Sequence, residues 1–68
     1  MADPVYRKCE YVGTSTKSFY EAAANAVAKA AKDLKNMSWF EVVEHRGSIV
    51  DGKIHQFQVT VQIGYSAD

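Results

Sequence analysis

The chain has 68 residues, and its eight basic and eight acidic side chains give a formal net charge of zero. A domain of this length buries only about 60% of the surface that its unfolded chain exposes, so its core needs support from a metal, disulfides or partner chains. The single cysteine, Cys9, excludes an internal disulfide, and His45 and His55 are too far apart in sequence for a helical metal pair, which leaves oligomerisation as the expected support.

The same features exclude several classes of function. A net charge of zero provides no overall attraction to nucleic acid or to an anionic membrane. No apolar stretch is as long as a membrane span, and the sequence before Val5 lacks the regions of a signal peptide. The sequence therefore predicts one domain, residues 1–68, that is soluble and cytoplasmic and binds neither nucleic acid nor a membrane.

A strand, a turn and a helix are predicted for the first half of the chain. Residues 5–12 are rich in β-branched and aromatic types, and residues 13–15 (Gly-Thr-Ser) predict a turn. Ser18 and Glu21 have the spacing of a capping box, which predicts a helix from Phe19. One narrow apolar face of this helix is expected to consist of Phe19, Ala23, Ala26, Val27, Ala30 and Leu34.

Two long strands are predicted after Met37, joined by a hairpin at Asp51-Gly52, because both central positions of a type I′ turn need positive φ. Pairing across this turn places Ile49 opposite Ile54, His45 opposite Gln58, and Trp39 opposite Gly64. The face covered by the helix would then carry Phe40, Val42, Phe57, Val59, Val61 and Ile63. The other face would carry Trp39, Glu41, Val43, His45, Gln56, Gln58, Thr60 and Gln62.

Trp39, the only tryptophan, is thus expected on a polar face among glutamines. An antiparallel sheet covered by one helix can leave its other face in water, so an ordinary solvated surface is one interpretation. A stacking platform for a planar heterocycle, with amides as hydrogen-bonding partners, is the other, and periodicity favours neither. In the expected register Trp39 and Gln58 lie roughly 20 Å apart. Either a bulge near residues 44–47, with Gly47 as the bend, brings them together, or two protomers share the site.

The sequence resembles the dodecin family over nearly its whole length. The resemblance lies in residues 12–15 (Val-Gly-Thr-Ser), 30–31 (Ala-Ala), 39–44 (Trp-Phe-Glu-Val-Val-Glu), 46–47 (Arg-Gly) and 57–61 (Phe-Gln-Val-Thr-Val), in this order and spacing. It implies an α+β fold: a β-α-β-β protomer whose three-stranded antiparallel sheet wraps around one helix, assembled into a hollow homododecamer. It also implies a flavin, FMN or riboflavin, bound in stacked pairs between tryptophans.

The resemblance assigns four cofactor-binding residues. Trp39 matches the stacking tryptophan, and Gln58 matches the glutamine that hydrogen-bonds the polar edge of the flavin. Glu44 matches an acidic residue near the ribityl hydroxyls, although the expected register turns it toward the helix unless the strand is irregular. Arg46 matches an arginine associated with the phosphates of FMN or coenzyme A. Many members carry another arginine near the C-terminus, where this chain has Ser66, which weakens the case for coenzyme A.

Neither a catalytic residue nor a metal ligand is predicted. The sequence contains no nucleophile–base pair and no phosphate-binding glycine loop, and a flavin clamped between aromatic rings leaves little room for a substrate. The expected function is a flavin store that quenches the photochemistry of its ligand. The alternatives are a structural assembly without a ligand, a binder of FMN plus coenzyme A, and, with least support, a flavin-dependent redox enzyme.

Overall fold

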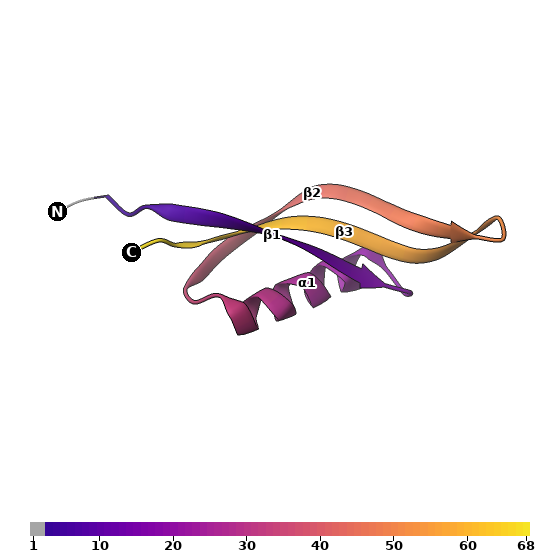
Figure 1. The fold of residues 1–68 in the computed structure, drawn as a ribbon, viewed down its shortest axis with the longest axis horizontal. Coiled ribbons are helices and arrows are strands. Elements are labelled where there is room, and N and C mark those ends of the chain that lie inside the picture. Colours follow the sequence, from indigo (N-terminus) through magenta and orange to yellow (C-terminus); the bar gives the residue numbers. More distant parts are fainter. Residues whose placement is uncertain (1–2) are drawn as a thin grey trace.

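The computed structural model describes residues 3–68, which form a β-α-β-β unit (Figure 1). The three strands are β1 (Tyr6–Ser15), β2 (Met37–Val50) and β3 (Lys53–Ser66), and the helix is α1 (Phe19–Asp33). β3 lies between β1 and β2 and is antiparallel to both, while α1 covers one face of the open sheet. The predicted α+β protomer, with a three-stranded antiparallel sheet and one helix, is confirmed.

β1 is longer than predicted, and its C-terminal end corrects the sequence interpretation. Gly13, Thr14 and Ser15 do not form a turn but continue the strand, opposite Val59, Gln58 and Phe57. A Cβ atom at Gly13 would collide with the carbonyl oxygen of Ala22 and lie 2.8 Å from the Cβ of Ala26. The glycine is therefore needed for close approach of α1 to β1, and not for a turn.

α1 begins where the sequence predicted. The side chain of Ser18 accepts a hydrogen bond from the backbone N–H of Glu21 at 3.0 Å, and the hydroxyl of Ser15 donates to the Glu21 carboxylate at 3.0 Å. At the other end, the Tyr11 hydroxyl of β1 donates to Asp33 at 2.9 Å, and this bond raises the pKa of Tyr11 to about 12. Both ends of the helix are thus tied to β1.

The buried core is small and consists of short side chains. Ala22, Ala26 and Ala30 of α1 pack on Val59, Val61 and Ile63 of β3, and each of the six is at most 3% exposed. The buried stripe of α1 is therefore centred on Ala22, Ala26 and Ala30, whereas the predicted members Ala23, Val27 and Leu34 lie at its margin and Phe19 is 39% exposed. Alanine lets the helix lie close to the sheet, but contributes little apolar area.

The hairpin turn is confirmed at Asp51 and Gly52, which have φ angles of 52° and 75°. Next to it, Ile49 faces Ile54 as predicted, but β3 then has an extra residue, and Ser48 faces Gln56. β2 has the compensating extra residue, Val43, between Val42 and Glu44. The predicted register therefore holds at the turn and again from Val42 to Trp39, and is wrong by one residue between the two irregularities.

This shift changes which side chains share a face. We call the sheet face turned away from α1 the open face; it carries the even-numbered residues of β3 from Gln56 to Gly64. His45 was predicted there, but it lies opposite Val59, and its ring meets Phe19 of α1 edge to face at a centroid distance of 5.1 Å. Glu44, expected on the helix side, lies opposite Thr60 on the open face. Paired residues of antiparallel strands point to the same face, so both corrections follow from the one-residue shift between the extra residue in β3 and Val43 in β2.

Candidate functional site

Trp39 lies on the open face, with its indole ring over Gly64. The two residues are directly opposite each other in β2 and β3, as predicted. A Cβ atom added to Gly64 would collide with Cδ2, Cε2 and Cζ2 of the indole at nearly equal distances. These are three consecutive atoms of the six-membered ring, so the added carbon would lie over the middle of that ring. The indole therefore rests with one face on the backbone of β3, in space that only glycine leaves free.

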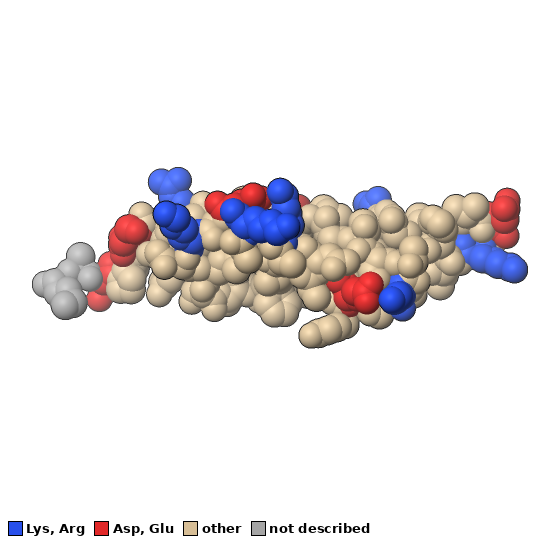
Figure 2. Space-filling model, turned by 90° about the horizontal axis from the view of Figure 1, so that it is seen from below, with Lys and Arg blue, Asp and Glu red and all other residues tan. Residues whose placement is uncertain are grey.

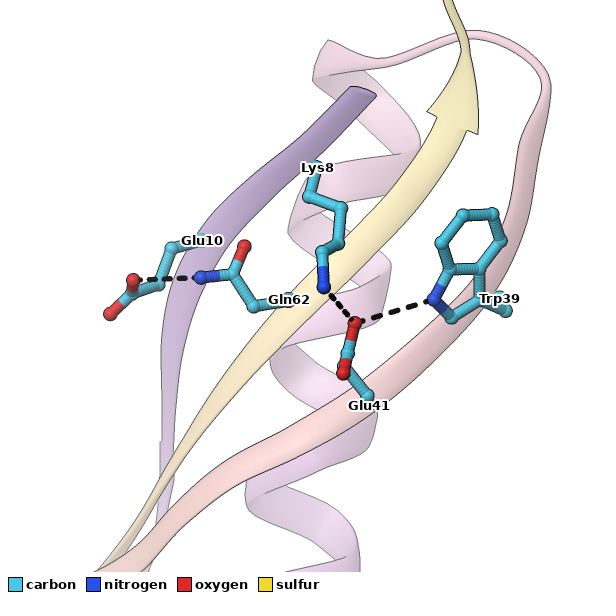
Figure 3. Close-up of polar contacts among 5 residues, drawn as sticks. All are labelled: Lys8, Glu10, Trp39, Glu41 and Gln62. Atoms are coloured by element: carbon cyan, nitrogen blue, oxygen red, sulfur yellow. Dashed lines mark hydrogen bonds and ion pairs between the residues drawn. The ribbon is translucent and has the colours of Figure 1, made fainter. Parts of the chain in front are cut away.

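Two further side chains, Tyr6 and Glu41, contact the indole. Tyr6 of β1 meets it in a T-shaped arrangement, with ring centroids 5.2 Å apart and planes inclined at 71°. On the other side, the indole Nε1–H donates to Oε1 of Glu41 at 3.5 Å (Figure 3). The ring is thus in contact with the β3 backbone, with Tyr6 and, through Nε1, with Glu41, while 40% of the residue stays exposed. Its second face points away from the sheet, as a stacking platform requires.

Glu41 itself is anchored across the sheet. Nζ of Lys8, on β1, lies 2.7 Å from Oε1 of Glu41, and Figure 3 shows the lysine reaching over β3 to the oxygen that also accepts the indole N–H. The hydrogen bond from Lys8, and then the one from Trp39, lower the pKa of Glu41. The carboxylate is therefore ionised at neutral pH and is a charged acceptor for the indole.

A second group of polar side chains lies on the open face nearer the hairpin turn. Nε of Arg46 donates to Oε1 of Gln58 at 2.7 Å, and Nε2 of Gln58 donates to Oε1 of Gln56 at 3.0 Å. The carboxylate of Glu44 lies 3.9 Å from Nη1 of Arg46. We call these four residues the arginine–glutamine cluster. Gln58 is held from both sides by its neighbours, which fixes the orientation of its amide.

Three of the four candidate residues therefore lie together, and the fourth does not. Glu44, Arg46 and Gln58 form one cluster, whereas Trp39 lies opposite Gly64, six positions along β3 from Gln58, which corresponds to roughly 20 Å. The strand irregularity expected near residues 44–47 lies just before them, at Val43, and does not shorten this separation. Gly47 is not the bend: it faces Phe57 in regular register, and a Cβ there would lie 2.6 Å from the Gln56 carbonyl oxygen.

The residues that contact the indole, and Lys8 behind Glu41, were not among the predicted site residues: Tyr6, Lys8, Glu41 and Gly64. Glu41 was placed on the same face as Trp39, and a residue two positions along a strand is a natural neighbour, so this contact could have been found. Tyr6 and Lys8 could not, because no residue pattern fixed the register of β1 against β3. Gly64 was paired with Trp39, but a glycine within a strand can mark a bulge, a bend or a close approach, so the pairing alone does not show that a ring lies over it.

Within residues 3–68, the structure shows no group of histidine, cysteine, aspartate or glutamate side chains that could hold a metal ion. In this same part of the chain, no helix has the length and apolar character needed to cross a membrane.

Fold and site together define a class of small protein in which one helix covers a three-stranded antiparallel sheet and a supported tryptophan lies exposed on the other sheet face. The family model for dodecin matches residues 5–68. A dodecin from Thermus thermophilus is 41% identical over 61 residues, which cover 90% of this chain and 88% of the relative. The chain belongs to the dodecin family.

Solved structures of dodecins agree with this assignment. A dodecin from Streptomyces davaonensis superposes with a TM-score of 0.91 at 40% identity and covers 98% of both chains. The dodecin from Streptomyces coelicolor gives a TM-score of 0.91 at 38% identity, covering 100% of this chain and 97% of the relative. The whole described fold, including the long β2–β3 hairpin, is thus shared with these proteins.

Proposed function

We propose that this protein is a flavin store: a homododecamer that binds FMN or riboflavin in stacked pairs between Trp39 side chains and quenches their photochemistry. The observation that carries the proposal is the support of the indole, which exposes one ring face while its other face rests on Gly64. An aromatic ring held flat in this way can stack on a planar ligand with little loss of conformational entropy.

The separation between Trp39 and the arginine–glutamine cluster supports a site shared between protomers. One isoalloxazine ring is too short to contact Trp39 and Gln58 of the same chain across roughly 20 Å of sheet. A flavin stacked on Trp39 of one protomer could contact Gln58 of a neighbour, with Glu44 beside the ribityl chain and Arg46 beside a phosphate. Binding and assembly would then depend on each other.

The surface of the single chain also supports assembly. Figure 2 shows the side that carries α1 as mostly uncharged, with charged side chains in small separate groups. A groove on this side is lined by Tyr20, Ala23, Ala24, Val27, Ala28 and Phe40, and Tyr20 and Phe40 are 83% and 53% exposed. Apolar surface of this kind is typical of contacts between subunits. These contacts would supply the stability that the small alanine-rich core lacks.

Replacing Arg46 with alanine separates two roles of this side chain. If it contacts a phosphate, the affinity for FMN should fall about fivefold, the effect of losing roughly 1 kcal/mol at an exposed ion pair, while the affinity for riboflavin stays the same. If it only orients Gln58, both affinities should fall together. Fluorescence titration with the two flavins distinguishes these results, and Lys53→Ala, at the start of β3, is the control for the loss of a surface charge.

Binding without catalysis is the role that fits this geometry best. A flavin sandwiched between two indoles leaves little access for a substrate, and electron transfer from the stacked indole would quench the excited flavin. A structural assembly without a ligand is the alternative, because Trp39 could fill a contact between subunits instead. Coenzyme A remains a second candidate ligand, with Arg46 as its phosphate contact.

The decisive experiment uses two variants, Trp39→Ala and Gln58→Ala, each expected to bind riboflavin poorly. At a protein concentration that just saturates quenching of riboflavin fluorescence by the unmodified apoprotein, each variant should quench much less. If the site is shared, co-refolding the two variants should restore quenching at a fraction of the sites, because some sites combine an intact Trp39 with an intact Gln58 from another chain. Absence of quenching by the unmodified apoprotein would refute the store and favour the structural assembly.

A further inference from the structure

We infer that Glu41, anchored by Lys8, is a positioning residue that fixes the orientation of the Trp39 indole and releases it when the carboxylate is protonated. The inference concerns the side chains behind the stacking ring. The expected effect of Glu41 on ligand binding rests on the proposed flavin site, whereas the expected effect of Glu41 on the orientation of Trp39 does not. None of the expected site residues includes Glu41 or Lys8.

Gly64 and Tyr6 do not by themselves fix the rotation of the indole. Contact with the backbone at Gly64 sets the height of the ring above the sheet, and Tyr6 packs against it in a T-shaped arrangement. Both contacts are apolar and non-directional. The hydrogen bond from Nε1 to Glu41 is the directional contact, because a flipped ring would turn its only N–H away from the carboxylate.

Glu41 can serve as a fixed acceptor because Lys8 restrains it. The side chains of Lys8 and Glu41 are 50% and 46% exposed, so an unrestrained glutamate at this position would sample several rotamers. The 2.7 Å contact joins β1 to β2 across the central strand and uses Oε1, the oxygen that faces the indole. The lysine thus orients the acceptor, and the acceptor orients the ring.

Protonation of Glu41 should weaken its contacts with Lys8 and Trp39, and this loss should occur as the pH falls. Lys8 and Trp39 stabilise the charged carboxylate and lower its pKa, so the contact is complete at neutral pH and is lost as the pH falls through that lowered value. The ionisable groups that face Glu41 are Lys8 and, one strand further, Glu10, whose carboxylate accepts a hydrogen bond from Gln62 at 3.0 Å. Glu10 does not contact the indole and makes a matched control.

The test follows the emission of Trp39, the only tryptophan, in the apoprotein as the pH is lowered. We expect the emission intensity and anisotropy to titrate in the unmodified protein and in Glu10→Gln. The transition should be absent in Glu41→Gln, and it should move to higher pH in Lys8→Met, because the cation that favours ionisation is removed. A transition that persists in Glu41→Gln would overturn the inference.

Ligand binding provides the second measurement. At neutral pH, Glu41→Leu should weaken riboflavin binding about fivefold, as expected for one lost hydrogen bond. Glu41→Gln, which is uncharged like the protonated carboxyl and cannot hold Lys8 by charge, should weaken it nearly as much, whereas Glu10→Gln should stay within about twofold. Unchanged emission and unchanged affinity in Glu41→Leu would also contradict the positioning role. If the unmodified protein binds no flavin, the flavin site is wrong, but the emission titration still decides the role of Glu41.

Discussion

Replacing Trp39 with alanine is expected to weaken riboflavin binding by roughly 5- to 150-fold, because stacking of a nucleobase on an aromatic side chain contributes roughly 1–3 kcal/mol. Saturable quenching of flavin fluorescence should be lost with it, since the indole is the proposed electron donor. Binding by isothermal calorimetry and quenching by fluorescence measure the two effects separately.

Trp39→Phe is the matched control for this prediction. Phenylalanine keeps a ring over Gly64 but has no N–H for Glu41 and is a poorer electron donor. Binding should therefore fall less than in Trp39→Ala, while quenching should fall nearly as far. The oligomeric size of each variant must match that of the unmodified protein. If Trp39→Ala bound flavin with full affinity, the tryptophan would not be the stacking platform.

Replacing Gly13 with alanine is expected to cost roughly 1–3 kcal/mol in the free energy of unfolding, the usual effect of overpacking. The new methyl group would collide with the carbonyl oxygen of Ala22, a backbone atom that can move only with the whole helix. α1 would have to shift away from β1, and its contacts with Val59 and Val61 would loosen. Chemical denaturation at matched protein concentration measures the effect, because the stability of an oligomer depends on concentration.

Thr14→Ala, one residue further along β1, controls for the change in strand propensity. Thr14 is exposed, and only its backbone carbonyl bonds to the helix, by accepting a hydrogen bond from Asn25 at 2.9 Å. Its replacement should change the stability by less than about 0.5 kcal/mol, as is usual for surface positions. Equal stabilities of Gly13→Ala and Thr14→Ala would show that α1 can move away from β1 without cost.

The sequence allowed the fold to be predicted because its local signals agreed. The N-cap at Ser18 and the Asp-Gly turn are determined by their own neighbours in the chain, so they appear in the structure where they were predicted. The other half of the capping box does not form, because the Glu21 carboxylate accepts from Ser15 and the Ser18 N–H donates to Ser15. The alternation of Val59, Val61 and Ile63 was equally clear and correctly gave the buried face of β3.

The errors arose where long-range contacts decide the conformation. Residues 13–15 (Gly-Thr-Ser) have a composition typical of a turn, but the close approach of α1 to β1 determines the role of Gly13. The displacement of His45 and Glu44 depends on the two extra residues that bound their segment, one in β3 next to the turn and Val43 in β2, and no local pattern distinguishes an irregular strand from a regular one. The support of Trp39 by Tyr6 and Lys8 depends on the pairing of β1 with β3, which brings together residues from the two ends of the chain.

Two of the three irregularities in the β2–β3 pairing compensate each other: the extra residue in β3 next to the turn, and the extra residue Val43 in β2. With the extra residue in β3 alone, Trp39 would fall opposite Tyr65 and point toward the helix; Val43 restores the original phase and returns it to the open face. Only the interval between them stays out of phase, and that interval contains Glu44 and Arg46. Deletion of Val43 would therefore turn Trp39 from the open face toward the helix, while the contacts near the turn stayed the same.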